Sequence, residues 1–447
     1  MSCLRNAVFA VSAACVVFSA PGAAIANPAD AYGFGARGPG MASALTAGVD
    51  DGAANYYNPA ALATLPGLSV GLGYQYVSHQ LDINGLDQSI SSARGAALSF
   101  STPGKVLGRR VALGGGFFIP DNHLTRTRTL SSDHPRFSLY DNRPQRLFIA
   151  SNIAVEITKR LSLGGGVSFI SRPKGGITVA GRVGFPVADD SDLDLNIDVD
   201  LLTIRYGQVG ALFQATDWLK IGATYRTGFE LEIDQAFTIQ GNVGPADATP
   251  VIEDAYLTLT TVSQDHFQPA TFTVGAFAQV TSRLALAFDM AWFQWSKFPN
   301  PAAVVTLDYD LKDFNSLFDI PDPPPLPNLN YSDIIVPRIG VEYLAVSSAK
   351  TDVMVRGGYS FEASPVPEQV GQTNHIDNDK HTFSMGATYT MKKWSSIVPK
   401  PASFDIYFAF TMLSARSHRK LSAVDPIGDY ESTGQVFQMG AASRWSF

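Results

Sequence analysis

Two short strings in the sequence have the spacing of motifs that carry enzyme chemistry. Residues 67–71 read Gly-Leu-Ser-Val-Gly, the G-x-S-x-G pattern in which a sharp strand-to-helix turn exposes a nucleophilic serine. Here the string opens a predicted β-strand, which offers Ser69 no such turn. Residues 33–38 match the G-x-G-x-x-G phosphate-binding loop, but no strand precedes them. Neither string predicts an enzyme.

Metal ligation has equally weak support. The seven histidines show no ligand spacing such as H-E-x-x-H. Residues 190–201 (DSDLDLNIDVDL) place a row of acidic and amide side chains at 192–200 on one face of a strand, and hard cations such as calcium favour oxygen ligands. A straight strand lacks the loop that wraps an ion, so a solvated strand extension is the favoured interpretation. Contact with divalent cations near lipopolysaccharide stays open. We expect no metal site and no cofactor.

The first residues predict export. Residues 1–26 contain a positive charge, an apolar stretch at 7–20 and a small-x-small cleavage site at 24–26. These features define a secretory signal peptide, which is too short to serve as a membrane span. Both cysteines of the chain, Cys3 and Cys15, fall within it. The mature chain is therefore expected to have neither a disulfide nor thiol chemistry.

Composition narrows the class of protein. The formal net charge of −7 disfavours a nucleic-acid partner, because such partners require a basic surface. Charged residues make up only 16% of the chain, and the mean hydropathy is +0.05. No uninterrupted apolar stretch of 18 residues follows the signal peptide, so no transmembrane helix is predicted. The apolar residues must therefore be interleaved with other residues.

Alternation along the chain predicts strands with one apolar face. In residues 284–292 every second side chain is large and apolar, and the residues between are mostly alanine. Residues 221–233 and 353–361 repeat the pattern, and the second face is rich in Gly, Ala, Ser and Thr rather than Lys and Glu. In 221–233 the apolar face comprises Ile221, Ala223, Tyr225, Phe229, Leu231 and Ile233.

The same pattern predicts fourteen strands whose connections alternate in length. Short turns follow even-numbered strands, and the long connections 120–144, 235–266 and 298–333 follow odd-numbered ones. One end of the structure should therefore carry turns and the other end loops. The predicted strands are 68–79, 94–101, 109–119, 145–157, 160–171, 201–215, 218–234, 267–280, 283–297, 334–346, 351–361, 380–392, 403–414 and 434–447.

This layout is typical of an up-and-down barrel in the bacterial outer membrane. A Greek-key sandwich, the alternative with alternating strands, would scatter its loop lengths. The predicted fold is an all-β, 14-stranded antiparallel transmembrane β-barrel. Its last strand ends in Trp445, Ser446 and Phe447, and an aromatic end of this kind is typical of chains that the barrel-assembly machinery recognises. That strand must pair with the first, since a sheet in lipid cannot leave an edge open.

A barrel of fourteen strands encloses a lumen that wall side chains cannot fill, since about eight strands already suffice to make a filled barrel. Residues 27–66 are exported, rich in small residues and unlike a strand, so they are the available filling. We therefore divide the chain into a signal peptide (1–26), an N-terminal hatch inside the lumen (27–66) and an outer-membrane β-barrel (67–447).

The hatch region carries a family resemblance. The run GFGARGPGMASALTAGVDDGAANYYNPAAL, with Asn58-Pro59-Ala60, resembles the hatch of the FadL-type outer-membrane transporters for long-chain fatty acids and aromatic hydrocarbons. VPRIGVEYLA (336–345) and VRGGYSFEASPVP (355–367) resemble later strands of that family. The resemblance implies a fourteen-stranded barrel with a hatch and passive uptake. The resemblance also implies that extracellular loops collect a hydrophobic ligand, which then leaves sideways into the membrane through a kinked strand beside the hatch.

Glycine triplets mark candidate positions for that kink. Gly114, Gly115 and Gly116 lie in the third predicted strand, where the family has its opening, and glycine weakens a strand or marks a bulge. Residues 164–166 in the fifth strand form a second triplet, so the signal is not unique. The alternative is that a glycine wall simply makes room for a bulky hatch.

Hydrophobic capture requires apolar side chains at the cell surface. The long connection after the ninth strand contains DLKDFNSLFD, and its apolar residues share one helical face. This face could form a ligand groove or merely cap the barrel mouth, and both readings stay open. The capture candidates are Leu311, Phe314, Leu317 and Phe318.

Three arginines are predicted to face the lumen: Arg226, Arg338 and Arg356. A guanidinium there could bind a ligand carboxylate. The alternative, which we favour, is that these charges pair with acidic residues across the lumen, among them Asp289 and Glu342.

The function that these features predict is passive outer-membrane transport of hydrophobic compounds by a monomer. The expected partners are hydrophobic small molecules, outer-membrane lipid, lipopolysaccharide and the barrel-assembly machinery. The alternatives are a diffusion porin for small solutes, an outer-membrane lipid enzyme and a surface adhesin with long loops. The sequence does not distinguish fatty acids, alkanes and aromatic rings, because each needs an elongated apolar path.

Overall fold

The computed structural model describes most of the chain that follows the predicted signal peptide. The signal peptide (1–26) lies outside the described residues. The described ranges are 28–122, 134–140, 146–184, 191–244, 249–317, 323–392 and 401–447.

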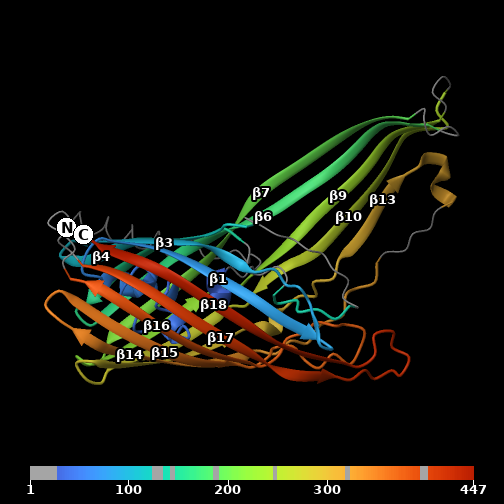
Figure 1. Cartoon of the computed structure of the whole chain (residues 1–447). Coiled ribbons are helices and arrows are strands. Elements are labelled where there is room, and N and C mark those ends of the chain that lie inside the picture. Colours follow the sequence, from blue (N-terminus) through green and yellow to red (C-terminus); the bar gives the residue numbers. More distant parts are fainter. Residues whose placement is uncertain are drawn as a thin grey trace.

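Within these residues, fourteen antiparallel strands join edge to edge into a closed barrel, which confirms the predicted fold class (Figure 1). The last strand pairs with the first from Ser446 opposite Ser69 to Ser432 opposite Ile83, so the wall has no open seam. The wall strands are β1 (Ser69–Ile83), β3 (Ala93–Val106), β4 (Arg109–Pro120), β5 (Phe148–Thr158), β6 (Leu161–Gly184), β7 (Asp192–Gln214), β8 (Leu219–Arg226), β11 (Thr271–Gln279), β12 (Leu284–Phe293), β14 (Ile334–Ser347), β15 (Thr351–Glu362), β16 (Lys380–Met391), β17 (Ala402–His418) and β18 (Tyr430–Ser446). A two-residue strand, β2 (Leu86–Asp87), follows β1.

Large apolar side chains point out of the wall, and small ones point in. In β12, Leu286 and Phe288 are 41% and 46% exposed, whereas Ala285 and Ala287 are almost fully buried. This is the predicted alternation for 284–292, and it gives the barrel an apolar outer surface. Tight turns such as 107–108 and 348–350 gather at one end, here called the turn end, and the long connections lie at the other, the loop end (Figure 1).

The prediction of one strand over 218–234 with a single apolar outer face is wrong. Ile221 and Tyr225 of β8 point outward, but the backbone leaves the ladder at Thr227 and Gly228 before a new strand, β9 (Phe229–Gly244), begins. Alternation fixes a face only while the strand is unbroken, so the two intervening residues transfer the following side chains to the other face. The apolar residues of β9 are consequently buried at the rim of the barrel: Phe229, Leu231 and Ile233.

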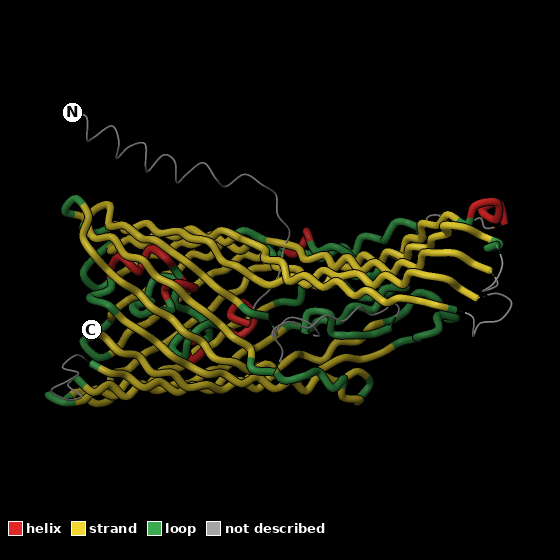
Figure 2. Tube along the Cα trace, turned by 90° about the horizontal axis from the view of Figure 1, so that it is seen from above, coloured by secondary structure: helices red, strands yellow, loops and turns green. Residues whose placement is uncertain are grey.

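The long connections 235–266 and 298–333, expected to be loops, contain strands. Residues of β6 and β7 beyond the barrel join β9, β10 (Ile252–Gln268) and β13 (Val304–Asp310) in a sheet that projects from the loop end (Figures 1 and 2). We call it the projecting sheet, and its strand order is β7-β6-β9-β10-β13. The strands of the projecting sheet alternate apolar residues with threonine, a pattern that fits a sheet outside the membrane. The prediction missed these strands because it limited each strand to the length that crosses the membrane.

The ribbon formed by β6 and β7 turns over between the barrel and the projecting sheet. In the barrel, β7 lies between β6 and β8, but in the projecting sheet β6 lies between β7 and β9, which continues β8. The exchange requires about half a turn of the ribbon relative to β9, and two-stranded ribbons twist strongly. The pairing of β6 with β9 is parallel, whereas the other strand pairs described are antiparallel. The turn brings the outer face of β6 beside the inner face of β9.

The N-terminal segment (residues 28–66) lies inside the barrel near the turn end (Figure 2). It consists of short helical turns joined by irregular chain, and most of its side chains are buried. No described helix has the length and apolar character to cross a membrane. The helical elements are α2 (Pro28–Tyr32), η1 (Pro39–Met41), α3 (Ala54–Tyr57) and η2 (Pro59–Thr64) in the segment, and η4 (Trp295–Lys297) and η5 (Lys312–Leu317) at the loop end.

Glycines in the wall allow the N-terminal segment to touch the strand backbones. A Cβ added at Gly164 would lie 2.5 Å from the Ala60 nitrogen, and one at Gly358 would fall on the backbone of Met41. Because an added Cβ would lie so near the segment, no residue with a side chain fits at these positions. We call the six wall glycines that meet the segment in this way the glycine collar: Gly114, Gly164, Gly210, Gly222, Gly340 and Gly358.

We expect Gly358→Ala to displace the N-terminal segment, because the added methyl group overlaps the backbone of Met41. Overpacking of this kind costs about 1–3 kcal/mol. The variant should show a lower thermal unfolding midpoint and faster proteolysis within residues 28–66. Gly357→Ala is the matched control, since a Cβ there lies 3.5 Å from its nearest neighbour, an ordinary contact. Equal stability and protease resistance of the two variants would contradict the role of the collar.

Candidate functional site

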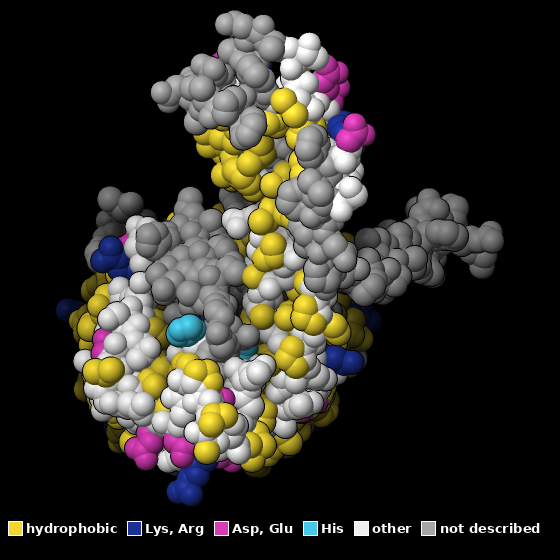
Figure 3. Space-filling view, turned by 90° about the vertical axis from the view of Figure 1, so that its right-hand side faces the viewer, with side chains coloured by type: hydrophobic (Ala, Val, Ile, Leu, Met, Phe, Trp, Pro, Cys, Tyr) yellow, Lys and Arg dark blue, Asp and Glu magenta, His cyan; other side chains and the backbone are white. Residues whose placement is uncertain are grey.

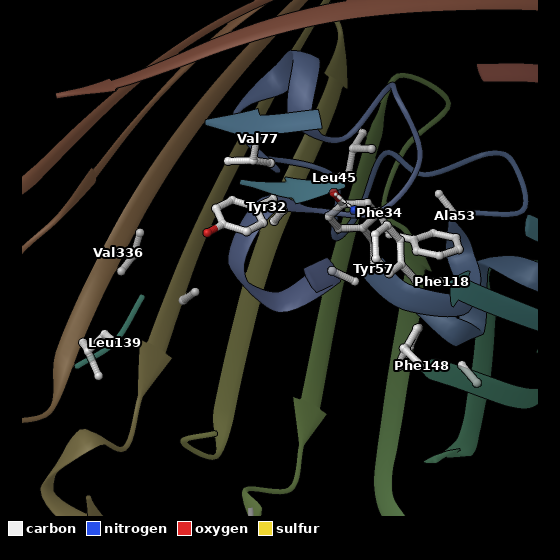
Figure 4. Close-up of a cluster of buried hydrophobic side chains, with 14 of the residues drawn as sticks. Tyr32, Phe34, Leu45, Ala53, Tyr57, Val77, Phe118, Leu139, Phe148 and Val336 are labelled. Carbon is white, nitrogen blue, oxygen red and sulfur yellow. Dashed lines mark hydrogen bonds between the residues drawn. The ribbon is translucent and has the colours of Figure 1, made fainter. Parts of the chain in front are cut away.

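A cavity of about 180 Å³ lies in the lumen on the loop side of the N-terminal segment. Tyr32 of the segment forms part of its floor, and Val336 of β14 forms part of its wall. Leu139 and Tyr140, from the described stretch 134–140, line it as well. In Figure 4, Tyr32 points away from the aromatic group of Phe34, Tyr57, Phe118 and Phe148, toward the side where Val336 and Leu139 lie. We call this the luminal cavity.

A second cavity, of about 400 Å³, lies on the turn side of the segment. Turn-end residues such as Arg283 line it, together with Arg37 of the segment. The N-terminal segment therefore separates two spaces within the barrel.

A cluster of largely buried aromatic side chains lies beside the luminal cavity. Trp295, which lines the cavity, packs against Phe267 and Phe298 with ring centroids 5.7 and 6.0 Å apart. Phe298 in turn stacks on Tyr331 at 4.3 Å. Aromatic faces of this kind offer apolar contact area at low conformational cost. The loop end of the cavity is thus suited to an apolar guest.

Arg226, one of the predicted luminal arginines, is engaged by the N-terminal segment. Its guanidinium forms a 2.6 Å ion pair with Asp30, donates to the Tyr56 carbonyl oxygen at 2.8 Å and lies 4.3 Å from the Tyr56 ring centroid. The Tyr56 hydroxyl donates to the same carboxylate at 2.7 Å. Burial raises the pKa of Tyr56 well above its ordinary value, and Asp30 adds to the effect, so the phenol stays protonated.

Arg338, the second predicted arginine, lines the luminal cavity and differs from Arg226 in its ion pairing. Within the described part of the chain it forms no ion pair, and its guanidinium lies 5.9 Å from the Phe293 ring centroid. Lys380, the other cation beside Arg226 on the cavity wall, is paired with Glu362 at 2.8 Å and Asp377 at 3.0 Å. Arg338 is therefore the cavity cation that is available to an anionic group.

Arg356, the third arginine, lies in a buried ion network on the turn side of the segment. It lies 3.2 Å from both Glu342 and Asp405. Arg37 of the segment forms a forked pair with Glu342, with distances of 2.9 and 2.5 Å. Arg444 of β18 pairs with Asp405 and with Asp51 of the segment, each at 3.0 Å. The network ties the segment to β14, β15, β17 and β18.

Two asparagines hold the segment to the opposite wall. Asn55 donates to the carbonyl oxygens of Phe100 and Gly115, each at 3.0 Å. Asn58 donates to the Ala211 carbonyl oxygen at 3.0 Å and accepts from the Ala60 nitrogen at 3.1 Å, which caps η2. In the predicted Asn58-Pro59-Ala60 motif, the asparagine makes these hydrogen bonds and the other two residues are buried.

The predicted kink at Gly114, Gly115 and Gly116 lies in β4, the third wall strand. The pairing of β4 with β3 and β5 runs through the triplet without a register shift. Added Cβ atoms at Gly114 and Gly116 would meet Asn55, so both glycines make room for the segment. A lateral opening at this strand stays a prediction.

Of the predicted capture residues, Leu311 and the backbone of Phe314 and Leu317 lie at the far end of the projecting sheet, away from the luminal cavity. Leu311 follows β13 and is partly buried, and η5 comes next in the chain. The side chains of Phe314 and Leu317, and all of Phe318, lie outside the described residues. The acidic row at 192–200 forms the exposed outer part of β7. In the described part of the chain, no group of His, Cys, Asp and Glu is arranged to hold a metal.

Sequence reasoning missed two parts of the site. Leu139 and Tyr140 come from a connection expected to be a plain loop, although FSLY at 137–140 is an apolar string in a polar stretch. The second part is the contact between Thr46 and Asp289, in which the Thr46 nitrogen and hydroxyl both donate to the carboxylate at 2.9 and 2.7 Å. No spacing rule links residues so distant in the chain.

Comparison with known proteins assigns the family. Residues 16–444 match the family model described as outer membrane protein transport protein (OMPP1/FadL/TodX). The chain belongs to the OMPP1/FadL/TodX family. This confirms the predicted resemblance and places the protein in the outer membrane. The family consists of transport channels rather than enzymes.

Relatives within the OMPP1/FadL/TodX family cover nearly the whole chain. Alkane uptake protein A of Marinobacter nauticus is 23% identical over 450 residues, which are 96% of this chain and 93% of that protein. A FadL homologue of Pseudomonas aeruginosa aligns with a TM-score of 0.57 at 16% identity, over 96% of this chain and 100% of its own. The toluene transporter TodX of P. putida aligns with a TM-score of 0.54 at 16% identity, over 93% and 99%. At these identities the solved structures establish the fold alone.

We expect Arg37→Met to loosen the N-terminal segment, because it leaves Glu342 buried without its forked partner. Breaking a buried pair costs about 3–5 kcal/mol. The measurement is the single-channel conductance of the purified protein in planar bilayers, which should rise as the turn-side and loop-side spaces connect.

Arg172→Met is the control for this prediction. Its ion pair with Asp234, at 3.2 Å, is partly exposed on the projecting sheet and should contribute less than about 1 kcal/mol. Conductance that rises in both variants, or in neither, would argue against the ion network as the fastening of the segment.

Proposed function

We propose that the protein is a passive channel for hydrophobic compounds, in which residues 27–66 act as a hatch that seals the lumen and moves to release the ligand. The observation that carries the proposal is the N-terminal segment itself. It lies between the luminal cavity, to whose wall Phe293 and Trp295 contribute aromatic rings, and a turn-side space. A ligand in the luminal cavity can proceed only if the segment moves or the wall opens.

The cavity wall supports an apolar ligand. Phe293 and Trp295 contribute aromatic rings to the cavity wall, and Leu139 and Val336 add aliphatic side chains. The names of two relatives, an alkane uptake protein and a toluene transporter, agree with such a ligand class. A diffusion porin for small polar solutes is the alternative, and the position of the segment between two spaces of the lumen supports the hydrophobic channel over it.

We place the exit beside the hatch, at the wall formed by β18, β1 and β3. Small residues line a cavity of about 30 Å³ between the segment and this wall, among them Gly71, Gly73 and Ala97. Phe34 of the segment lies in the same space. Sideways release there delivers an apolar ligand to lipid rather than to water, which the hydrophobic effect favours.

A disulfide that locks the hatch to β4 tests this proposal. An added Cβ at Gly116 lies 3.5 Å from the Asn55 Cβ, within the separation of about 3.5–4.5 Å that disulfides require. Both native cysteines lie in the predicted signal peptide, so an introduced pair has no competitor in the mature chain. We expect the oxidised Asn55→Cys/Gly116→Cys variant to lose uptake of radiolabelled hexadecane and oleate by cells, and reduction to restore it.

The single variants Asn55→Cys and Gly116→Cys are the controls, since each carries one substitution without the cross-link. Both should transport like the reduced double variant. If the oxidised protein still transports both compounds at the reduced rate, a moving hatch is excluded. That result would return the porin alternative.

The free guanidinium of Arg338 suggests how the channel treats ligands with a carboxylate. Such a head group would reach Arg338 in the luminal cavity while its chain contacts the aromatic rings of the cavity wall. We expect Arg338→Gln to lower oleate uptake about tenfold, since a hydrogen bond to a charged group contributes about 1.5–3 kcal/mol. Uptake of hexadecane, which has no head group, should not change.

Arg338→Lys should retain part of the oleate uptake because it keeps the charge but not the fork. Arg160→Gln, at an exposed turn residue, is the control for loss of one positive charge. An equal loss of oleate and hexadecane uptake in Arg338→Gln would assign the arginine a structural role only.

The remaining partners follow from the location of the barrel. Outer-membrane lipid and lipopolysaccharide surround the apolar outer wall, and we propose that the exposed Phe447 after β18 serves recognition by the barrel-assembly machinery. The closed wall needs no second subunit to complete it, so we propose a monomer.

A further inference from the structure

The projecting sheet carries apolar side chains in register across all five strands. In one row, Ile197, Ile177, Phe237, Leu259 and Leu307 lie opposite one another from β7 to β13. A second row contains Leu195, Val179, Ile239, Leu257 and Tyr309. Directly paired residues point to the same face of a sheet. We call the face that these ten residues define the apolar ladder.

The other face of the same sheet is polar in the same register. The row between the two apolar rows consists of Asn196, Thr178, Thr238, Thr258 and Asp308. The hydroxyls of Thr238 and Thr258 lie 3.1 Å apart, as a hydrogen-bonded pair across two strands. The projecting sheet is therefore amphipathic over its whole width.

The apolar ladder is exposed. Ile197 is 59% exposed, Leu195 63%, Phe237 40% and Leu259 37%, so the described residues leave it largely uncovered. Hydrophobic side chains gather along the projecting sheet in Figure 3. Soluble surfaces rarely keep apolar area of this extent without a binding function.

The ladder leads into the barrel along β9. Ile239 and Phe237 belong to the ladder, and the same face of the strand continues past Gln235 to the buried Ile233 and Phe229. Phe229 stacks on Tyr206 of β7 with ring centroids 4.3 Å apart, and its pairing partner Gln268 lines the luminal cavity. An apolar molecule that adsorbs on the ladder thus has a strand face, apolar except at Gln235, to follow into the lumen.

We propose that the apolar ladder docks on the surface of undissolved hydrocarbon, such as an oil droplet, and so collects ligand from a separate phase rather than as dissolved molecules. A flat amphipathic element binds an oil–water boundary by burying one face and keeping the other in water. The proposal rests on the proposed transport function for its purpose, but adsorption can be measured without transport.

The charges of the projecting sheet favour an uncharged phase over two other occupants. The outer part of β7 presents Asp192, Asp194, Asp198 and Asp200, all exposed and on the polar face. Elements that bind anionic bilayers carry Lys and Arg instead. The acidic row also lies on the free edge strand, where charge opposes pairing with a second copy of the chain. An oil surface carries no fixed charge and meets only the ladder.

The test is the adhesion of cells that display the full-length protein to hexadecane, read as the fraction of cells that leave the aqueous suspension. The ladder variant combines Ile177→Thr, Ile197→Thr, Phe237→Thr and Leu259→Thr, because threonine preserves strand propensity. We expect its adhesion to fall about tenfold or more relative to the native protein, given the apolar area removed. The matched control, Thr178→Ser, Asn196→Ser, Thr238→Ser and Thr258→Ser, alters the polar face and should adhere like the native protein.

Further measurements distinguish a failure of the proposed transport function from a failure of the ladder inference. Uptake of hexadecane supplied in dissolved form as a cyclodextrin complex should be equal in the ladder variant and the native protein. Native protein that adheres to droplets but takes up no dissolved hexadecane would overturn the proposed function and leave the ladder inference standing. If the ladder variant runs as an unfolded chain on semi-native gels, Phe237→Thr alone replaces it and should still reduce adhesion.

Two results would overturn the inference. One is native-level adhesion of a folded ladder variant. The other is that cross-linking finds the native protein as an oligomer and the ladder variant as a monomer, while both adhere equally. That result would identify a second copy of the chain as the occupant of the ladder.

Discussion

The constraint on which the structure depends is the lack of side chains where the wall meets its N-terminal segment. Six strands each present one glycine of the collar to the segment, and the segment fills the space that side chains would otherwise occupy there. Backbone approaches backbone there, as at Gly164 and Ala60, so the fit depends on shape rather than on apolar area. A wide barrel can then be closed by about forty residues with hardly any regular structure. The wall and the segment specify each other, and neither can change alone.

Charge complements shape in holding the segment. Buried ion pairs are weak contributors to net stability, because desolvation of the charges offsets their attraction. They do impose one geometry, and here the forked contact of Arg37 with Glu342 fixes the segment against β14, while Asn55 and Asn58 fix it against the opposite wall. Polar contacts of this kind exchange for water more readily than a packed apolar core does, which agrees with the hatch movement that we propose.

The sequence predicted what depends on a uniform surrounding and missed what depends on contacts distant in the chain. Lipid surrounds every wall strand in the same way, so the alternation at 284–292 places that strand correctly. The same rule failed at 221–233, since nothing in the spacing shows that Thr227 and Gly228 break the strand. The two glycine triplets look alike in sequence, and only the folded barrel shows that Gly114 makes room for Asn55 and Gly164 for Ala60. Arg226, Arg338 and Arg356 line spaces within the barrel, but which of them is ion-paired depends on the segment and on neighbouring strands.

The attachment of the segment to β18 has a consequence for the order in which the protein assembles. Asp51 is paired with Arg444, and the Tyr32 carbonyl oxygen accepts a hydrogen bond from Gln438 at 2.6 Å. Both partners belong to β18, about 400 positions further along the chain. Asp51 and the Tyr32 carbonyl oxygen therefore lack these partners until β18 is in place. Because β18 also pairs with β1, closure of the wall and seating of the segment depend on the same strand and are therefore coupled.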